Sequence, residues 1–250
     1  MLKHKQVVQL MSWLDLTSLR DEDTAESIAN WSQQAQQPWG TAAAVCVYPA
    51  WIQAARVGLV HLDAQVSIAT VVNFPAGDAT PAATAASTTA AIRAGADEID
   101  VVLPYQALLA GNQSHALSVL QACRAACPER VMKVIIESGM LPNASAIEVA
   151  CQLAIKAGAD FIKTSTGKAA VHATLPAVQT ILNTIQASPE SVGIKISGGV
   201  KTLAQAAPYV NLIEHTMGEA WMTPAHVRFG ASSLLQDLRL FFEKSAINQM

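Results

Sequence analysis

The sequence predicts an α/β protein whose parallel strands close into a single (β/α)8 barrel. Short apolar runs rich in β-branched residues alternate with helical stretches along the chain, a pattern typical of a parallel sheet covered by helices. The length of 250 residues suits one closed barrel of eight units. The chain is 51% hydrophobic and 14% charged, and soluble domains average roughly 25% charged residues, so we expect a large core.

Eight segments have the short, apolar composition of buried strands. In chain order they are residues 43–47, 66–72, 98–103, 131–137, 160–165, 192–196, 212–214 and 227–229. No linker or low-complexity tract divides them. We therefore expect a single domain over residues 1–250, in which residues 1–40 form a helical extension before the first strand.

The segments between the expected strands carry helix signals. Thr80 and Pro81 are an N-cap followed by proline at the first helical position, and the alanine-rich run to Arg93 continues this helix. Residues 143–156 place apolar side chains on one face, and Gly158 then ends the helix. These two stretches predict helices on the outside of the barrel.

Composition excludes several functional classes. The net charge is −3 and the pI is about 6.0, so no basic surface is expected for nucleic acid or an anionic membrane. No stretch approaches the roughly 18 apolar residues of a membrane span, and no signal segment is evident. The four cysteines form no CxxC pair and indicate a reducing compartment. We expect a cytoplasmic protein with no metal site, because no Cys, His or carboxylate set has ligand spacing.

An internal repeat brings an acid and an amine to equivalent positions. Residues 91–100 and 154–163 match at seven of ten positions, and each reads as a helix end, a glycine stop and a strand start. The repeat places Asp100 and Lys163 at one register of the expected third and fifth strands, where both side chains would share a layer of the barrel interior. This geometry is catalytic, or it is a structural ion pair left by duplication.

A second lysine repeats the arrangement. Lys195 follows Ile194 as Lys163 follows Ile162, on what we expect to be the neighbouring strand. Two inward ammonium groups repel each other, so one should lose its proton near neutral pH and become a nucleophile. The alternative places both lysines at the barrel rim, reaching solvent, as we expect for Lys133 near the start of the fourth strand.

Three loops rich in small residues follow strand ends. Their backbone N–H groups could approach an anion, and the loops after the last strands of such barrels commonly bind phosphate. Asp15 is read equally as a helix cap or as a ligand of a substrate hydroxyl, and Cys46 as core filler that could also line the cavity. The candidate substrate-binding residues are Asp15, Cys46, Thr166, Gly167, Lys168, Gly198, Gly199, Lys201, Gly230, Ser232 and Ser233.

Several of these segments together resemble the deoxyribose-phosphate aldolase family. The similarity is carried by residues 94–102, 134–137, 156–168 and 228–233, and its most specific element is FIKTSTG at residues 161–167. The resemblance implies a class I, metal-free aldolase on a (β/α)8 barrel. Such an enzyme reversibly cleaves 2-deoxy-D-ribose 5-phosphate to acetaldehyde and D-glyceraldehyde 3-phosphate, in deoxyribose phosphate catabolism.

The same resemblance implies residue roles. Lys163 would form the Schiff base, Lys195 would lower the pKa of Lys163, and Asp100 would relay protons. Implied phosphate positions are Gly167, Lys168, Gly198, Gly199, Ser232 and Ser233. Two positions depart from the family, because Lys201 stands where arginine is frequent and Arg20 where asparagine or leucine is common.

The expected partners are therefore a phosphosugar and small aldehydes, and a homodimer stays open. No cofactor is expected beyond the covalent imine on Lys163. The rival readings are another barrel aldolase, a phosphosugar isomerase, and a silent phosphosugar-binding barrel. The joint presence of Asp100, Lys163 and Lys195 argues against the last of these, because a binding protein does not need all three.

Overall fold

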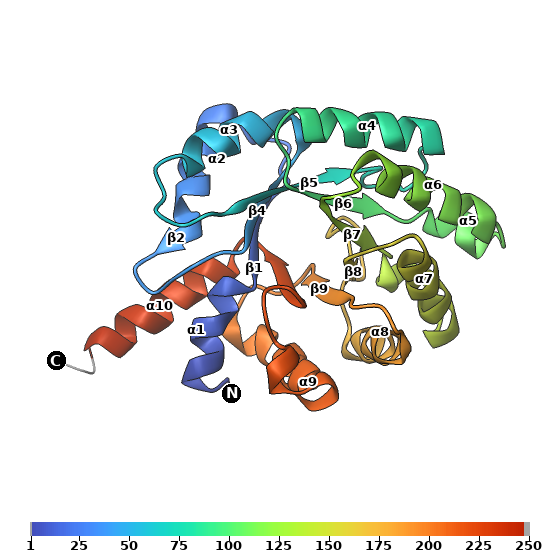
Figure 1. The fold of residues 1–250 in the computed structure, drawn as a ribbon. Coiled ribbons are helices and arrows are strands. Elements are labelled where there is room, and N and C mark those ends of the chain that lie inside the picture. Colours follow the sequence, from blue (N-terminus) through green and yellow to red (C-terminus); the bar gives the residue numbers. More distant parts are fainter. Residues whose placement is uncertain (1, 248–250) are drawn as a thin grey trace.

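Eight parallel strands close into a barrel in the computed structural model, which describes residues 2–247 (Figure 1). β1 pairs with both β4 and β10, so the first and last strands complete the ring. The predicted (β/α)8 architecture is confirmed. The barrel strands are β1 (Leu14–Ser18), β4 (Ala44–Val47), β5 (Ser67–Val72), β6 (Glu98–Val102), β7 (Val131–Ile135), β8 (Phe161–Lys163), β9 (Gly193–Ser197) and β10 (Val227–Ala231).

Helices surround the barrel on the outside, and a small antiparallel pair, β2 (Gln36–Gln37) and β3 (Gly40–Thr41), lies beside it (Figure 1). None of the helices in residues 2–247 has the length and apolar character needed to cross a bilayer. The helices are α1 (His4–Ser12), α2 (Ala25–Ser32), α3 (Ile52–Leu59), α4 (Pro81–Arg93), α5 (Tyr105–Leu109), α6 (Gln113–Ala126), α7 (Ala144–Lys156), α8 (Leu175–Ala187), α9 (Leu203–Met217) and α10 (Leu234–Ile247), with short 3-10 turns η1 (Gln33–Ala35), η2 (Pro49–Trp51), η3 (Ser138–Met140) and η4 (Glu219–Trp221).

The helix signals of the sequence are confirmed at α4 and α7. The Thr80 hydroxyl accepts a hydrogen bond from the Ala83 N–H at 3.2 Å, and Pro81 is the first residue of α4. The Asn143 side chain caps α7 by accepting from the Ala146 N–H at 3.0 Å. These side chains satisfy N–H groups that the first turn of a helix leaves free.

Two strand predictions were wrong. Residues 1–40 are not only a helical extension, because they contain β1, which pairs along both of its edges. Its inward side chain Asp15 is charged, which hides the apolar pattern of a buried strand. Residues 212–214 belong to α9, where Ile213 is buried against the core, so this apolar run is part of a helix face.

Adding β1 shifts the numbering of the later strands by one, but Asp100 and Lys163 remain on alternate strands of the barrel. β6 and β8, which carry the repeat, are the fourth and sixth barrel strands rather than the third and fifth. Both are still even-numbered strands of the barrel. Because alternate strands contribute side chains to the same interior layer, Asp100 and Lys163 are still expected to share one. The main apolar core lies between strands and helices, where Ile99 and Ile162 join Ala150 and Ile181 in one cluster. The barrel interior contains the charged side chains together with a small second apolar cluster, in which Cys46 and Ala69 pack together.

Candidate active site

Asp100 of β6 stands at the centre of a cluster of buried lysines inside the barrel. Lys163 Nζ of β8 and Lys195 Nζ of β9 each lie 2.8 Å from Asp100 Oδ2. Lys133 Nζ of β7 lies 2.8 Å from Asp100 Oδ1. All four residues are buried. The register pairs Lys163 with Lys195 and Asp100 with Lys133, so each pair of adjacent strands brings its two groups side by side.

Two further acids and an arginine complete the cluster. Asp15 Oδ2 of β1 lies 2.5 Å from Lys195 Nζ, and Asp15 Oδ1 accepts from Arg228 Nη1 at 2.7 Å. Glu98 bridges Arg228 Nη2 at 3.3 Å and Lys133 Nζ at 2.5 Å. We call the seven residues the charged network; its members are Asp15, Glu98, Asp100, Lys133, Lys163, Lys195 and Arg228.

The charged network is electrically balanced only if one of its cations is neutral. It contains three carboxylates and four basic groups, so full ionisation would leave one buried positive charge without a counterion, which is costly. Lys195 and Arg228 each contact two carboxylates and Lys133 contacts three, whereas Lys163 contacts Asp100 alone. Lys163 is therefore the group that loses its proton at least cost.

The pKa directions agree with this count. Burial lowers the pKa of Lys163; Asp100 opposes this and the Lys195 ammonium adds to it, and the net pKa lies below the ordinary lysine value. Burial acts on Lys195 in the same sense, but Asp100 and Asp15 outweigh it and raise the pKa of Lys195. Desolvation is thus the main cause of the low pKa of Lys163, and the neighbouring cation is a secondary one.

Two acids of the charged network, Asp100 and Asp15, have pKa values below the usual carboxyl value. Burial opposes ionisation of Asp100, but Lys133, Lys163 and Lys195 together bring its pKa well below the usual carboxyl value. Burial likewise opposes ionisation of Asp15, and Lys195 and Arg228 bring its pKa below the usual value. Asp100 is therefore a permanent negative charge beside the one amine that can be neutral.

A cavity of about 240 Å³ opens above Lys163 at the carboxyl ends of four strands. The loops after β1, β8, β9 and β10 form its wall, and its charged lining side chains are all basic. Active sites of this barrel architecture lie at this end of the strands. The lining residues are Thr17, Leu19, Arg20, Lys163, Thr166, Gly167, Lys168, Ser197, Gly198, Gly199, Val200, Lys201, Gly230, Ala231 and Ser232.

The cavity wall offers backbone donors as well as cations. Gly198 and Gly199 have left-handed φ angles of +81° and +79°, which turn the chain sharply after β9. The N–H groups of Gly199, Val200 and Ser232 donate to no acceptor among the described residues. Helix α10 begins immediately after Ser233, so its positive end faces the same region. Free N–H groups and a helix N-terminus are a common anion site.

A family model for DeoC/LacD family aldolases matches residues 9–238 of the sequence, from α1 to α10 and through every barrel strand. The chain belongs to the DeoC/LacD family of aldolases. The buried lysines and the basic cavity described above all lie within the matched residues.

Solved structures extend this likeness to nearly the whole chain. A protein from Toxoplasma gondii ME49, provisionally named a deoxyribose-phosphate aldolase, superposes with a TM-score of 0.85 at 24% identity over 96% of both chains. One from Coccidioides immitis, named in the same provisional way, gives 0.80 at 27% identity over 93% of this chain and 87% of its own. Deoxyribose phosphate aldolase from Aeropyrum pernix gives 0.73 at 23% identity over 97% and 99%.

Most of the residues predicted from sequence line the cavity of this aldolase. Lys163 lies at its floor, and the three predicted loops contribute to its wall. The predicted residues that line it are Lys163, Thr166, Gly167, Lys168, Gly198, Gly199, Lys201, Gly230 and Ser232. Asp100 and Lys195 lie in the charged network below it, in contact with Lys163 or its partner.

Three candidates lie outside the cavity wall. Asp15 caps no helix; it is fully buried on β1 and bound to Lys195 and Arg228. Cys46 is buried with Leu19 and other apolar side chains, and burial raises the pKa of its thiol. Ser233 is exposed at the start of α10 and does not line the cavity, although its neighbour Ser232 does.

Sequence reasoning missed three members of the charged network. Lys133 was expected at the rim, but its side chain is fully buried and contacts Glu98 and Asp100. Glu98 and Arg228 were read only as parts of strands, although both are buried and joined to each other. The signal was present in the alternation of β6, since Glu98 and Asp100 are two residues apart and must point to the same side.

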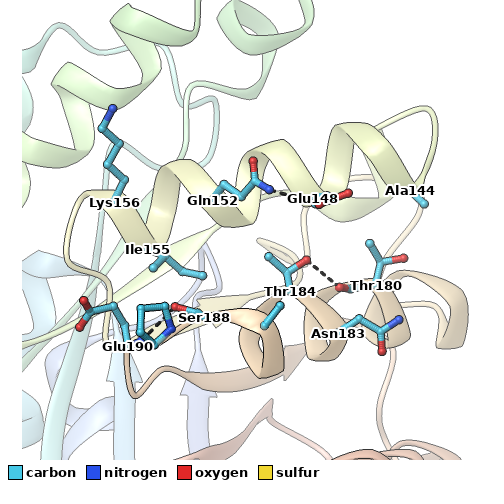
Figure 2. A pocket seen from close by; sticks show the side chains of 12 residues that line it. Ala144, Glu148, Gln152, Ile155, Lys156, Thr180, Asn183, Thr184, Ser188 and Glu190 are labelled. Atoms are coloured by element: carbon cyan, nitrogen blue, oxygen red, sulfur yellow. Dashed lines mark hydrogen bonds between the residues drawn. The ribbon is translucent and has the colours of Figure 1, made fainter.

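A larger cavity of about 750 Å³ lies on the outer surface between α7 and α8 (Figure 2). Two of its polar side chains bond to neighbours within the groove: Gln152 donates to Glu148 at 3.2 Å, and the Thr184 hydroxyl donates to the Thr180 backbone carbonyl at 2.9 Å. The groove contains no member of the charged network. Within residues 2–247, no three His, Cys, Asp or Glu side chains are grouped as a metal site would require.

Proposed function

We propose that this aldolase cleaves 2-deoxy-D-ribose 5-phosphate, reversibly, to acetaldehyde and D-glyceraldehyde 3-phosphate through an imine on Lys163. One observation carries the proposal. Lys163 is an amine of lowered pKa beside a permanent carboxylate, at the floor of a cavity whose charged lining is basic. A lysine that forms an imine needs a lowered pKa, and a phosphorylated substrate needs a basic cavity lining.

The first steps use the neutral amine. Lys163 Nζ attacks the C1 aldehyde of the open-chain sugar, and the resulting carbinolamine loses water to give a protonated imine. This cation occupies the place that the Lys163 ammonium would take, 2.8 Å from Asp100 Oδ2. Because the pKa of Asp100 lies well below the usual value, its negative charge is present whenever the imine forms and stabilises it.

The carbon–carbon bond then breaks between C2 and C3. A water oriented by Asp100 and Lys195 takes the proton of the C3 hydroxyl, C3 becomes the aldehyde carbon of D-glyceraldehyde 3-phosphate, and the bonding electrons pass through C2 into the imine to give an enamine. Protonation of C2 and hydrolysis of the imine release acetaldehyde and restore Lys163. Lys195 keeps its proton, because Asp15 and Asp100 raise its pKa, so it supplies a fixed positive charge.

The rim of the cavity supports a phosphorylated substrate. Arg20, Lys168 and Lys201 are the cations of its wall, and the free N–H groups of Gly199 and Ser232 add neutral donors. We place the reaction in deoxyribose phosphate catabolism in the cytoplasm, with no cofactor besides the imine itself.

Reductive trapping tests the proposal. Incubation with acetaldehyde and borohydride should leave one ethyl group on Lys163, found by mass spectrometry of peptides, because reduction converts the imine to a stable secondary amine. Lys168→Arg removes the other cavity-lining amine close to Lys163 in sequence and should leave the label in place. Lys163→Arg should abolish both the label and the cleavage of 2-deoxy-D-ribose 5-phosphate.

Two results would contradict the proposal. Ethyl groups confined to exposed lysines would show that Lys163 forms no imine. Trapping on Lys163 without cleavage of 2-deoxy-D-ribose 5-phosphate would support imine formation but exclude this sugar as the substrate. A different aldol substrate would then be sought.

A further inference from the structure

Arg20 enters the cavity wall already oriented by a buried carboxylate. It follows β1, and its backbone N–H donates to Asp23 Oδ2 at 3.0 Å. Its Nε lies 3.1 Å and its Nη2 3.0 Å from Asp23 Oδ1. The Asp23 side chain is 0% exposed and also accepts from the Ser18 hydroxyl at 2.8 Å. The guanidinium is thus fixed along the edge formed by Nε and Nη2.

The opposite edge of the guanidinium is free. Arg20 Nη1 makes no hydrogen bond to any described residue, and Nη2 has a second N–H beyond the one facing Asp23. The Arg20 side chain is 57% exposed and lines the cavity. The edge formed by Nη1 and Nη2 matches two oxygens of one phosphate group, which is the bidentate geometry that arginine provides and lysine does not.

The other two rim cations cannot provide this geometry. Lys168 Nζ donates to the Leu19 carbonyl at 2.8 Å and lies 6.0 Å above the Tyr48 ring, so its ammonium is partly engaged. Lys201 is an exposed ammonium, a point charge without a planar fork. Arg20, Lys168 and Lys201 carry three positive charges, and Asp23 behind Arg20 carries one negative charge. The resulting charge of about +2 matches a phosphate monoester dianion.

We infer that Arg20 binds the substrate phosphate through its Nη1–Nη2 edge, and that Asp23 positions it for this contact. The inference deepens the proposed function and rests on it for the identity of the substrate. It assigns to Arg20 the selectivity for a phosphate monoester over the unphosphorylated sugar. The loop after β1 then contributes to phosphate binding together with the loops after β8, β9 and β10.

Substitutions of Arg20 test the inference through a ratio of KM values. Arg20→Gln should raise KM for 2-deoxy-D-ribose 5-phosphate about tenfold, equivalent to about 1.4 kcal/mol of binding. Arg20→Lys keeps the charge without the fork, so its increase in KM should be smaller but measurable. With unphosphorylated 2-deoxyribose, kcat/KM should be unchanged in both variants. Arg56→Gln is a matched control, because Arg56 pairs with Asp97 at 2.7 Å and does not line the cavity.

The variant Asp23→Asn distinguishes positioning of Arg20 by Asp23 from a simple effect of the Asp23 charge on phosphate binding. Removing a negative charge near the phosphate should lower KM if only long-range attraction matters. If Asp23 positions Arg20, loss of its contacts should instead raise KM. The positioning role and the long-range charge effect therefore predict changes in KM of opposite sign. Thermal unfolding of each variant shows whether a change in KM accompanies a loss of folded protein.

Calorimetric titration with inorganic phosphate separates this inference from the proposed reaction. Tighter phosphate binding by the wild type than by Arg20→Gln supports the inference even if 2-deoxy-D-ribose 5-phosphate is not cleaved, a result that would overturn only the proposed function. Equal phosphate affinity in the two proteins, or equal KM changes for phosphorylated and unphosphorylated sugars, would overturn the role of Arg20. A lower KM in Asp23→Asn would overturn the positioning role of Asp23.

Discussion

Lys163 and Lys195, register partners on adjacent strands, both contact the same oxygen, Asp100 Oδ2, at 2.8 Å. One carboxylate oxygen therefore holds two amines that compete for it. Lys195 has a second carboxylate, Asp15, at 2.5 Å, and Lys163 has none. The competition is unequal, so the pKa of Lys195 is raised and that of Lys163 is lowered, as the proposed imine formation on Lys163 requires.

Lys195→Met should raise the pKa of Lys163. The substitution removes a positive charge that disfavours protonation of Lys163, and it leaves Asp100 Oδ2 to Lys163 alone, which favours protonation. Both effects have the same sign, so the acidic limb of the kcat/KM profile against pH should move to higher pH. Lys156→Met on the outer groove is the control. A lower rate with an unmoved limb would mean that Lys195 acts by another route.

Lys133→Met should destabilise the fold and raise the pKa of Lys163. Without Lys133, three carboxylates face Lys195 and Arg228, so protonated Lys163 becomes the third counterion. Breaking a buried ion pair by removing one partner costs roughly 3–5 kcal/mol, which urea unfolding would measure. Activity lost at pH 7 should return partly at alkaline pH, where Lys163 deprotonates.

The double variant Lys133→Met/Glu98→Gln is the matched test of this charge balance. It removes one cation and one carboxylate that contact each other at 2.5 Å, so Lys163 is again the surplus cation. Stability and neutral-pH activity should both exceed those of Lys133→Met alone. Additive losses from the two substitutions would show that Lys163 is not the surplus cation of the charged network.

Gly198→Ala should weaken phosphate binding more than Gly199→Ala. Both residues have left-handed φ angles, so both variants carry backbone strain. An alanine Cβ at position 198 would lie 2.7 Å from the His172 ring, whereas at position 199 the nearest ring atom is 3.5 Å away. We expect KM for the phosphorylated sugar to rise in both and most in Gly198→Ala. The double variant Gly198→Ala/His172→Ala lacks the ring, so its KM should fall to about that of Gly199→Ala. An unchanged difference in KM would contradict the steric explanation.

A carboxylate at position 232 should repel the substrate more strongly than one at position 233. Ser232 lines the cavity and Ser233 does not. Ser232→Asp should raise KM for 2-deoxy-D-ribose 5-phosphate at least about tenfold, or 1.4 kcal/mol, and Ser233→Asp should raise it less. Unphosphorylated 2-deoxyribose should be affected little by either. Equal effects of Ser232→Asp on both sugars would indicate general damage to the barrel.

The sequence was sufficient for the architecture and for the pairing of Asp100 with a buried lysine. Hydrophobic periodicity and glycine stops located most strands, and the repeat around Asp100 and Lys163 correctly placed both side chains in one interior layer. β1 was missed because Asp15 faces the interior and breaks the apolar pattern. Residues 212–214 were misread because a short apolar run fits a strand and a helix face equally well.

The full charged network could not be predicted, because it depends on long-range pairing. Arg228 and Glu98 are 130 positions apart and meet only when the ring of strands closes. Arg20 was noted only as a departure from the family, since nothing in the sequence shows that Asp23 is buried behind it. Such contacts follow from three-dimensional closure rather than from local pattern.

The pairing of Asp15 with Arg228 makes the charged network depend on the closure of the barrel. The two residues are separated by 213 positions and lie on the first and last strands, which are neighbours in the barrel. A chain that lacks β10 keeps the three carboxylates of the charged network but loses one of its four basic groups, so each of the three lysines then has a carboxylate to balance its charge. Lys163 would then retain its proton. Only the closed barrel therefore gives Lys163 its lowered pKa, so the pKa of this amine reports on the folding of the whole ring of strands rather than of β8 alone.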